Sequence, residues 1–244
     1  MNQQLESKIA VVTGAGRGIG RGIAIGFARQ GAKVVCAARS QAQLDETIRV
    51  IRDTGGDAIA HRCDVTRPDD LRDLYARTRA TYGPVDIVVA NAGGNFERRS
   101  VEDSDIAAWE ETLRVNLLGV YYTCKFAIPD LKTRGGHIIV IGSGMGHRDG
   151  GAGSAYSVSK AGAWMLVRNL ATELRDYGVC VNELIPGLVD TAILSEAERP
   201  AGSALSLEWF KQPADVVPLA LFLATQPPTG PTGQSFSLMR RDSQ

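Results

Sequence analysis

The sequence has no excess of either charge and no long apolar run. Its 27 Lys and Arg residues balance 27 Asp and Glu residues, and no long basic block occurs. Nucleic-acid-binding domains usually carry a basic excess, so we expect no nucleic-acid partner. The longest apolar stretch, 216–224, has nine residues with a proline among them, whereas a bilayer-spanning helix needs ~20. We therefore expect no membrane span.

Cysteine and histidine are also scarce. Four cysteines lie 27, 61 and 56 residues apart, which suits neither a zinc site nor a dense disulfide framework. None of the three histidines has ligand spacing to another His or Cys, so we expect no metal. The first eight residues, MNQQLESK, are polar and lack the apolar region of a secretory signal. We expect reduced thiols in a cytoplasmic protein.

Glycine, by contrast, is abundant, at 27 of 244 residues. Short apolar runs alternate with longer segments of helical periodicity, a pattern typical of repeated βα units around a buried parallel sheet. The expected strands are 9–12, 34–38, 58–60, 87–90, 138–141, 179–185 and 235–238. The expected helices are 18–30, 41–53, 68–82, 105–131, 154–177 and 214–224. The pattern predicts one α/β domain over 1–244, a doubly wound, mostly parallel seven-stranded sheet with helices on both faces, and a substrate loop at about 190–212.

A glycine-rich segment, TGAGRGIG at 13–20, follows the first expected strand and opens a helix. Glycines at this junction let the backbone approach a pyrophosphate, and the helix end supplies free N–H groups and a positive dipole. The spacing is T-G-x-x-x-G-x-G and does not fit G-x-G-x-x-G. A glycine-rich connection without a ligand is the alternative. The further βα units that follow favour a nucleotide site.

The second half of the chain has polar residues at expected strand ends. Tyr156 and Lys160 are four residues apart on one helix and project from the same face. Ser143 follows the strand 138–141, Asn91 follows 87–90, and Asn116 lies in the next helix. In doubly wound sheets, ligands bind at the carboxyl ends of the strands. We therefore expect these residues at one crevice.

Together these motifs resemble the short-chain dehydrogenase/reductases, and most closely their 3-oxoacyl-[acyl-carrier-protein] reductase-like branch. The similarity runs from about residue 8 to about 222 and includes TGAGRGIG, CDV at 63–65, NAGG at 91–94, RVNLLG around Asn116, Ser143, YSVSK at 156–160, and IPG at 185–187 with Thr191 four residues later. It implies a Rossmann-type fold, a nicotinamide cofactor, a small carbonyl or alcohol substrate, and a homo-oligomer, either tetramer or dimer. The C-terminal segment lacks the Asp-Gly-Gly that often follows the last strand in this family.

The resemblance also implies residue roles. Tyr156 would be the general acid/base, with its pKa lowered by Lys160. Ser143 would orient the substrate, and Asn116 would hold a water on the proton path. The implied catalytic set is Asn116, Ser143, Tyr156 and Lys160. The implied cofactor-binding set is Gly14, Arg17, Gly18, Ile19, Gly20, Arg39, Asp64, Val65, Asn91, Ala92, Gly93, Tyr156, Lys160, Pro186, Gly187, Val189 and Thr191.

Cofactor choice depends on the end of the second strand. An acidic residue there would bind the ribose 2′-OH and repel a 2′-phosphate, but no Asp or Glu occurs before Asp45. Arg39 and Arg17 are placed to meet a 2′-phosphate instead. The sequence therefore favours NADP(H) over NAD(H). Alternatively, both arginines are solvated and Arg39 stacks on adenine.

Two questions stay open at this level. The first concerns the arginines at 98, 99 and 148. They would hold an anionic group on a substrate. Alternatively they are solvated charges, with Asp149 neutralising Arg148. An epimerase or dehydratase that uses the cofactor transiently needs the same Tyr and Lys. A cofactor-sensing regulator would keep the fold and lose the chemistry, although the intact catalytic set argues against it.

Overall fold

The computed structural model describes residues 3–148, 153–191 and 209–239. Within them, seven strands form one sheet in the order β3-β2-β1-β4-β5-β6-β7, and every neighbouring pair is parallel. The strands are β1 (Ile9–Thr13), β2 (Lys33–Ala38), β3 (Asp57–Arg62), β4 (Ile87–Ala90), β5 (Gly136–Ile141), β6 (Val179–Ile185) and β7 (Ser235–Ser237). The doubly wound α/β sheet is confirmed, and it is wholly rather than mostly parallel.

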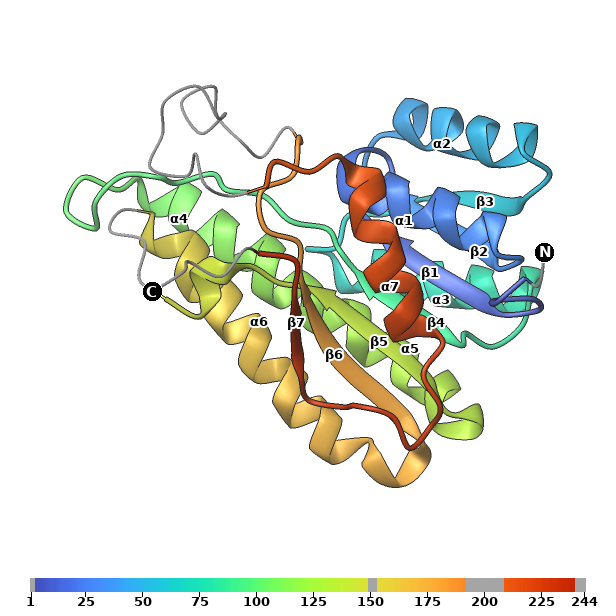
Figure 1. Ribbon diagram of the computed structural model, residues 1–244. Helices are drawn as coiled ribbons and strands as arrows, with labels where there is room; N and C mark the ends of the chain where they lie inside the picture. The colour runs from blue at the N-terminus through green and yellow to red at the C-terminus, as the bar shows by residue number, and fades with distance from the viewer. Residues whose placement is uncertain (1–2, 149–152, 192–208, 240–244) are drawn as a thin grey trace.

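Helices cover both faces of this sheet (Figure 1). Those with more than one turn in the described chain are α1 (Gly18–Arg29), α2 (Gln41–Asp53), α3 (Pro68–Thr81), α4 (Ile106–Leu113), α5 (Gly119–Arg134), α6 (Ser154–Glu173) and α7 (Val217–Ala224). Successive residues of a strand point to opposite faces. Val12 packs in the cluster that includes Phe27 of α1, whereas Val11 packs with Leu74 of α3. The core therefore has two apolar layers, one on each side of the sheet.

Three expected helices differ in detail. The segment expected as one helix over 105–131 contains α4, a π-helical turn at Arg114–Leu118, and α5. The π turn is centred on Asn116, whose side chain is drawn into hydrogen bonds with Gly94 and Ser159; such turns are frequent at functional sites. The other two helices are shorter than expected, because α6 gives way to the 3₁₀ turn Arg175–Tyr177 and α7 follows the 3₁₀ turn Pro213–Val216.

Most of the expected substrate loop at about 190–212 lies outside the described residues. Its two ends are joined, since Asp190 N donates to the Lys211 carbonyl at 2.8 Å and Lys211 N donates to the Leu188 carbonyl at 3.0 Å. No helix in the described part of the chain is both long and apolar enough for a membrane span. All four cysteines are free and buried.

Because the strands are parallel, their carboxyl ends meet along one edge of the sheet. The glycine-rich segment follows β1, Arg39 follows β2, Asn91 follows β4 and Ser143 comes two residues after β5. The topology therefore brings together residues that are up to 130 positions apart in the sequence.

Candidate active site

The glycine-rich segment forms a tight turn into α1. Gly14 and Gly18 have φ of +66° and +56°, a region that favours glycine. At Gly20 a Cβ would clash with the Asn91 side chain and with the Gly14 carbonyl. The first turn of α1 has no acidic residue and its N-cap, Arg17, makes no side-chain cap hydrogen bond, so no carboxylate of that turn opposes the positive end of the helix dipole. This geometry suits an anion such as a pyrophosphate.

Asn91 holds this turn in place from the end of β4. Its Nδ2 donates to the carbonyls of Thr13 and Gly14 at 2.8 and 3.4 Å. In return, Thr13 Oγ1 accepts from the backbone N of Asn91 and of Ala92 at 3.1 and 3.2 Å. The Asn91 amide is thus used within the protein, where it holds the shape of the glycine-rich turn.

Arg21 is a second support of the turn, and the sequence analysis missed it. Its Nη2 donates to the carbonyl of Gly16, and its Nε donates to Thr47 Oγ1 at 3.1 Å. The Thr47 hydroxyl in turn donates to the Ala15 carbonyl at 3.0 Å. An arginine directly after the last glycine of the motif was the available signal, but its partner on α2 is 26 residues away.

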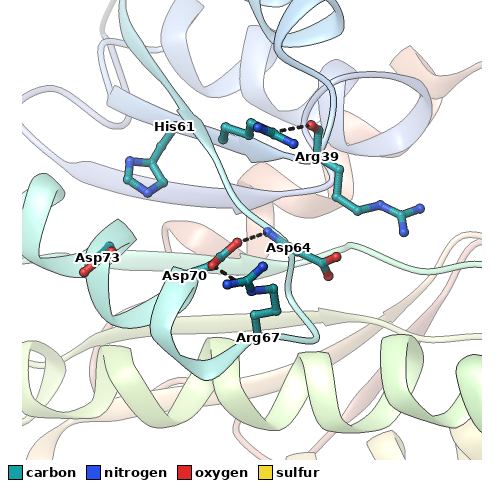
Figure 2. A pocket seen from close by; sticks show the side chains of 7 residues that line it. Arg39, His61, Asp64, Arg67, Asp70 and Asp73 are labelled. Carbon is teal, nitrogen blue, oxygen red and sulfur yellow. Dashed lines mark hydrogen bonds and ion pairs between the residues drawn. The ribbon is translucent and has the colours of Figure 1, made fainter.

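A pocket of about 480 Å³ opens beside the ends of β2 and β3. It is lined by Arg39, His61, Arg62, Asp64, Arg67, Asp70 and Asp73. Figure 2 shows the Arg39 guanidinium on the same side of this pocket as the Asp64 carboxylate, away from His61 and Asp73. Asp64 accepts from the Thr66 hydroxyl at 2.8 Å, and its N donates to Asp70 at 2.9 Å, which fixes the turn.

The two arginines expected at the nucleotide are both exposed. Within the described residues, neither Arg17 nor Arg39 forms an ion pair with a carboxylate. Val65, also in the expected set, is buried and packs on Gly119 of α5, where a Cβ would lie 2.7 Å from Val65 Cγ2. Only the backbone of Val65 is therefore available to a nucleotide.

Tyr156 and Lys160 lie one turn apart on α6, with Lys160 Nζ 5.7 Å from the centre of the Tyr156 ring. Lys160 is only 5% exposed, and its Nζ donates to the Ile141 carbonyl at the end of β5 at 2.8 Å. Burial lowers the pKa of the Lys160 ammonium from 10.5 to about 8, and the charge of Glu183 acts in the opposite direction. The structure therefore places a buried cation beside a phenol.

Ser143 and Asn116 adjoin this pair. Ser143 Oγ accepts from Met145 N at 3.2 Å, which leaves its hydroxyl hydrogen for another acceptor. Asn116 is fully buried; its Nδ2 donates to the Gly94 carbonyl at 2.7 Å and to Ser159 Oγ at 3.1 Å. The Asn116 side chain thus connects the loop after β4 to α6, and a Cβ at Gly93 would lie 3.0 Å from its Oδ1 and 3.7 Å from Lys160 Nζ.

The residues after β6 also approach the glycine-rich turn. Pro186 is buried and Gly187 has φ +70°. Val189 is 3% exposed, and its side chain packs in the core. Thr191 reaches Gly18, where a Cβ would lie 3.2 Å from Thr191 Cγ2. Thr191 and Gly18, two residues of the expected cofactor set, are therefore neighbours in the structure.

The loop after β4 is held by a buried carboxylate that the sequence analysis did not single out. Glu97 accepts from Arg99 Nε and Nη2 at 3.0 and 2.6 Å and from Asp105 N at 2.7 Å. These bonds from Arg99 and from the backbone lower the pKa of Glu97 to about 2. The Arg99 charge is thus already paired, which argues against Arg99 as a substrate anchor. Arg148 is exposed, and Asp149 lies outside the described residues.

Three or more metal-ligating side chains do not converge anywhere in the described part of the chain. The fold and the converging residues define a Rossmann-type domain of the dinucleotide-binding class. A family model described as short chain dehydrogenase matches residues 8–201. The chain belongs to the short-chain dehydrogenase/reductase family, whose members are oxidoreductases that bind a nicotinamide cofactor.

Known relatives share most of the chain. The L-fucose dehydrogenase of Oryctolagus cuniculus is 36% identical over 232 residues, which cover 90% of this chain and 79% of the relative. The 7α-hydroxysteroid dehydrogenase of Escherichia coli is 32% identical over 239 residues, 96% of this chain and 93% of the relative. The structure of an alcohol dehydrogenase from the archaeon Thermococcus sibiricus superposes with a TM-score of 0.85 at 30% identity and covers 97% of this chain and 99% of that one.

Proposed function

We propose that the protein transfers a hydride between NADP(H) and a carbonyl or secondary-alcohol substrate. The observation that carries this proposal is the pair of Tyr156 and buried Lys160 at the sheet edge where the glycine-rich turn opens. The turn fits a dinucleotide, because it offers positive-φ glycines and an unopposed helix N-terminus. The nicotinamide, when bound, supplies or accepts the hydride.

The protein's own part is position and proton transfer. In reduction, Tyr156 donates its phenolic proton to the substrate oxygen; in oxidation, it takes the proton back. The Lys160 ammonium stabilises the phenolate left behind, and low solvent exposure strengthens that attraction. Ser143 donates its hydroxyl hydrogen to the same substrate oxygen. Asn116 holds the loop after β4 against α6 and so keeps the two walls of the site together.

We assign the cofactor to Gly14, Arg17, Gly18, Ile19, Gly20, Arg39, Asp64, Val65, Asn91, Ala92, Gly93, Tyr156, Lys160, Pro186, Gly187, Val189 and Thr191. The whole of 1–244 then acts as one dinucleotide-binding domain, with a substrate loop at about 190–212. The free, buried cysteines support a reducing, cytoplasmic location. The π turn, α5 and α6 expose large apolar side chains, namely Leu118, Tyr121, Val158 and Met165, and this exposure supports a homo-oligomer.

Replacing Tyr156 by Phe tests the chemistry. The ring stays and the acid goes, so kcat should fall by ~10² or more, while the cofactor Kd stays within a few-fold of wild type. The assay follows NADPH absorbance with carbonyl compounds, and NADP⁺ reduction with sugars and hydroxysteroids, because the relatives named above are a fucose and a hydroxysteroid dehydrogenase. An acyl-carrier-protein thioester substrate tests the narrower branch, which stays a prediction. Wild-type turnover in Tyr156→Phe would refute the proposal.

NADP(H) is proposed over NAD(H) because Arg17 and Arg39 lie at the carboxyl ends of the strands, where the nucleotide would bind. Neither has a carboxylate partner in the described chain. The Thermococcus sibiricus structure was solved with 5-hydroxy-NADP, which supports the same choice. Arg39→Ala should weaken NADPH binding by ~10-fold or more and leave NADH binding nearly unchanged, since a charge-assisted hydrogen bond contributes ~1.5–3 kcal/mol. Fluorescence titration of both cofactors gives the ratio. Equal wild-type affinities for NADH and NADPH would contradict this choice.

A further inference from the structure

A carboxylate lies in the interior of the sheet next to the site. Glu183 is on β6, between residues that pack in the core, and its side chain is 1% exposed. Burial of a carboxylate costs free energy unless polar partners compensate it. Glu183 belongs to none of the motifs that mark the site in the sequence.

One oxygen of Glu183 joins two other elements. Oε2 accepts from the Ser235 hydroxyl of β7 at 2.5 Å and lies 2.7 Å from His147 Nε2. Opposite an ionised carboxylate, which only accepts hydrogen bonds, the donor of this pair is His147 Nε2. His147 ends the 3₁₀ turn Gly144–Gly146 that directly follows Ser143. Its ring also packs edge-on against Trp164 of α6, with centres 5.0 Å apart.

The other oxygen of Glu183 faces the end of β5. Oε1 is buried and has no hydrogen-bond partner within the described chain. A Cβ at Gly142 would clash with this oxygen, so the glycine before Ser143 makes room for the carboxylate. The turn after Ser143 also packs closely against α6. A Cβ at Gly146 would lie 2.8 Å from the carbonyl carbon of Lys160.

Glu183 also acts on Lys160 through space. Burial disfavours the Lys160 ammonium, and the Glu183 carboxylate opposes that effect by raising the pKa of Lys160. The groups that face the carboxylate are His147, Ser235 and Lys160, and those that face the Lys160 ammonium are Tyr156, Glu183 and the Ile141 carbonyl.

We propose that Glu183 is a positioning residue of the active site, which fixes the turn after Ser143 through His147 and supplies a negative charge within range of Lys160. The inference rests on the proposed function, because it assigns Ser143 and Lys160 to the reaction. It adds that the carboxylate holds the turn that follows Ser143 and favours the charged form of Lys160.

Glu183→Gln tests the charge, because it keeps the size of the side chain and one acceptor for His147. NMR titration of the Lys160 side chain should show a pKa lower than in wild type by about one unit, a tenfold change in its protonation equilibrium. Loss of an anion lowers the pKa of every nearby group. The alkaline limb of kcat/KM for carbonyl reduction should therefore move to lower pH, whichever group of the Tyr156–Lys160 pair governs it.

Ser235→Ala is the matched control, since it removes a hydrogen bond to the same oxygen and leaves the charge. It should titrate as wild type. His147→Ala should lower kcat/KM by about tenfold without moving the pH limb, because it releases the turn and keeps the carboxylate. The His147 side chain is 28% exposed, so this variant keeps the core intact if Glu183→Gln does not fold.

An unchanged Lys160 titration in Glu183→Gln would overturn the electrostatic part of the proposal, and wild-type kcat/KM in His147→Ala would overturn the positioning part. The NMR titration does not need turnover. If the wild-type protein reduced no carbonyl compound, the proposed function would fail while the coupling of Glu183 to Lys160 was still measured.

Discussion

Replacing Lys160 by Met should stabilise the fold while it removes the proposed activity. The buried ammonium is a cost to folding, because its pKa of about 8 lies below the 10.5 of a solvated lysine. That difference corresponds to about 3 kcal/mol. The variant also loses the hydrogen bond to the Ile141 carbonyl, worth ~1 kcal/mol. We expect a net gain of about 2 kcal/mol near neutral pH.

The cost of the buried ammonium to folding should depend on pH. Below about pH 8 the lysine is protonated in both the folded and the unfolded chain, so the folded state bears the full cost. Between about pH 8 and 10.5 only the unfolded chain keeps the proton, and the cost disappears as pH rises. From about pH 7 to 9.5 the wild-type protein should therefore recover about 2 kcal/mol relative to the Met variant.

The assay is urea unfolding of both proteins without cofactor across this pH range. Lys125→Met on α5 is the matched control, because Lys125 is exposed and its Nζ lies over the surface ring of Tyr121, 5.8 Å from the ring centre, and not in the core. Its stability difference from wild type should not change with pH. A difference between wild type and Lys160→Met that is equally flat would show that Lys160 is solvated in the folded protein, which would refute the reasoning.

Two further changes test the loops around the site. Gly14→Ala places a side chain at φ +66° and a Cβ 2.7 Å from Asn91 Nδ2, so cofactor Kd by fluorescence titration should rise at least ~10-fold; an unchanged Kd would mean that the turn does not bind the nucleotide. Glu97→Gln should loosen the loop that Glu97 ties to Arg99 and Asp105, seen as faster amide exchange at residues 97–105. Because the folded pKa of Glu97 is lowered to about 2, the wild-type loop should keep its protection above about pH 4.5 and lose it as pH falls toward 2; acid-insensitive exchange would contradict this.

The sequence by itself determined the features that depend on local spacing. Apolar runs placed the strands to within a few residues, because a buried parallel strand is apolar along its length. The spacing of Tyr156 and Lys160 fixed their common face, since four residues make about one helical turn. The glycine-rich spacing at 13–20 indicated a close turn between the first strand and a helix, and the structure shows that Gly14 and Gly18 in this turn have positive φ. The strand-helix alternation was sufficient for the doubly wound fold.

Only the tertiary structure decided which groups far apart in the sequence form hydrogen bonds or interact through their charges. Glu183 meets His147 across 36 residues, because β6 pairs with β5 and the turn after β5 folds back over β6. The periodicity of the sequence does not predict a contact between residues so far apart. The π turn at Asn116 likewise depends on partners in the loop after β4 and in α6. The pairing of Glu97 with Arg99 also depends on the folded loop, because the sequence does not say which of the neighbouring charges meet. The lowered pKa of Lys160 has the same origin, since burial is a property of the packed chain and not of its neighbours in sequence.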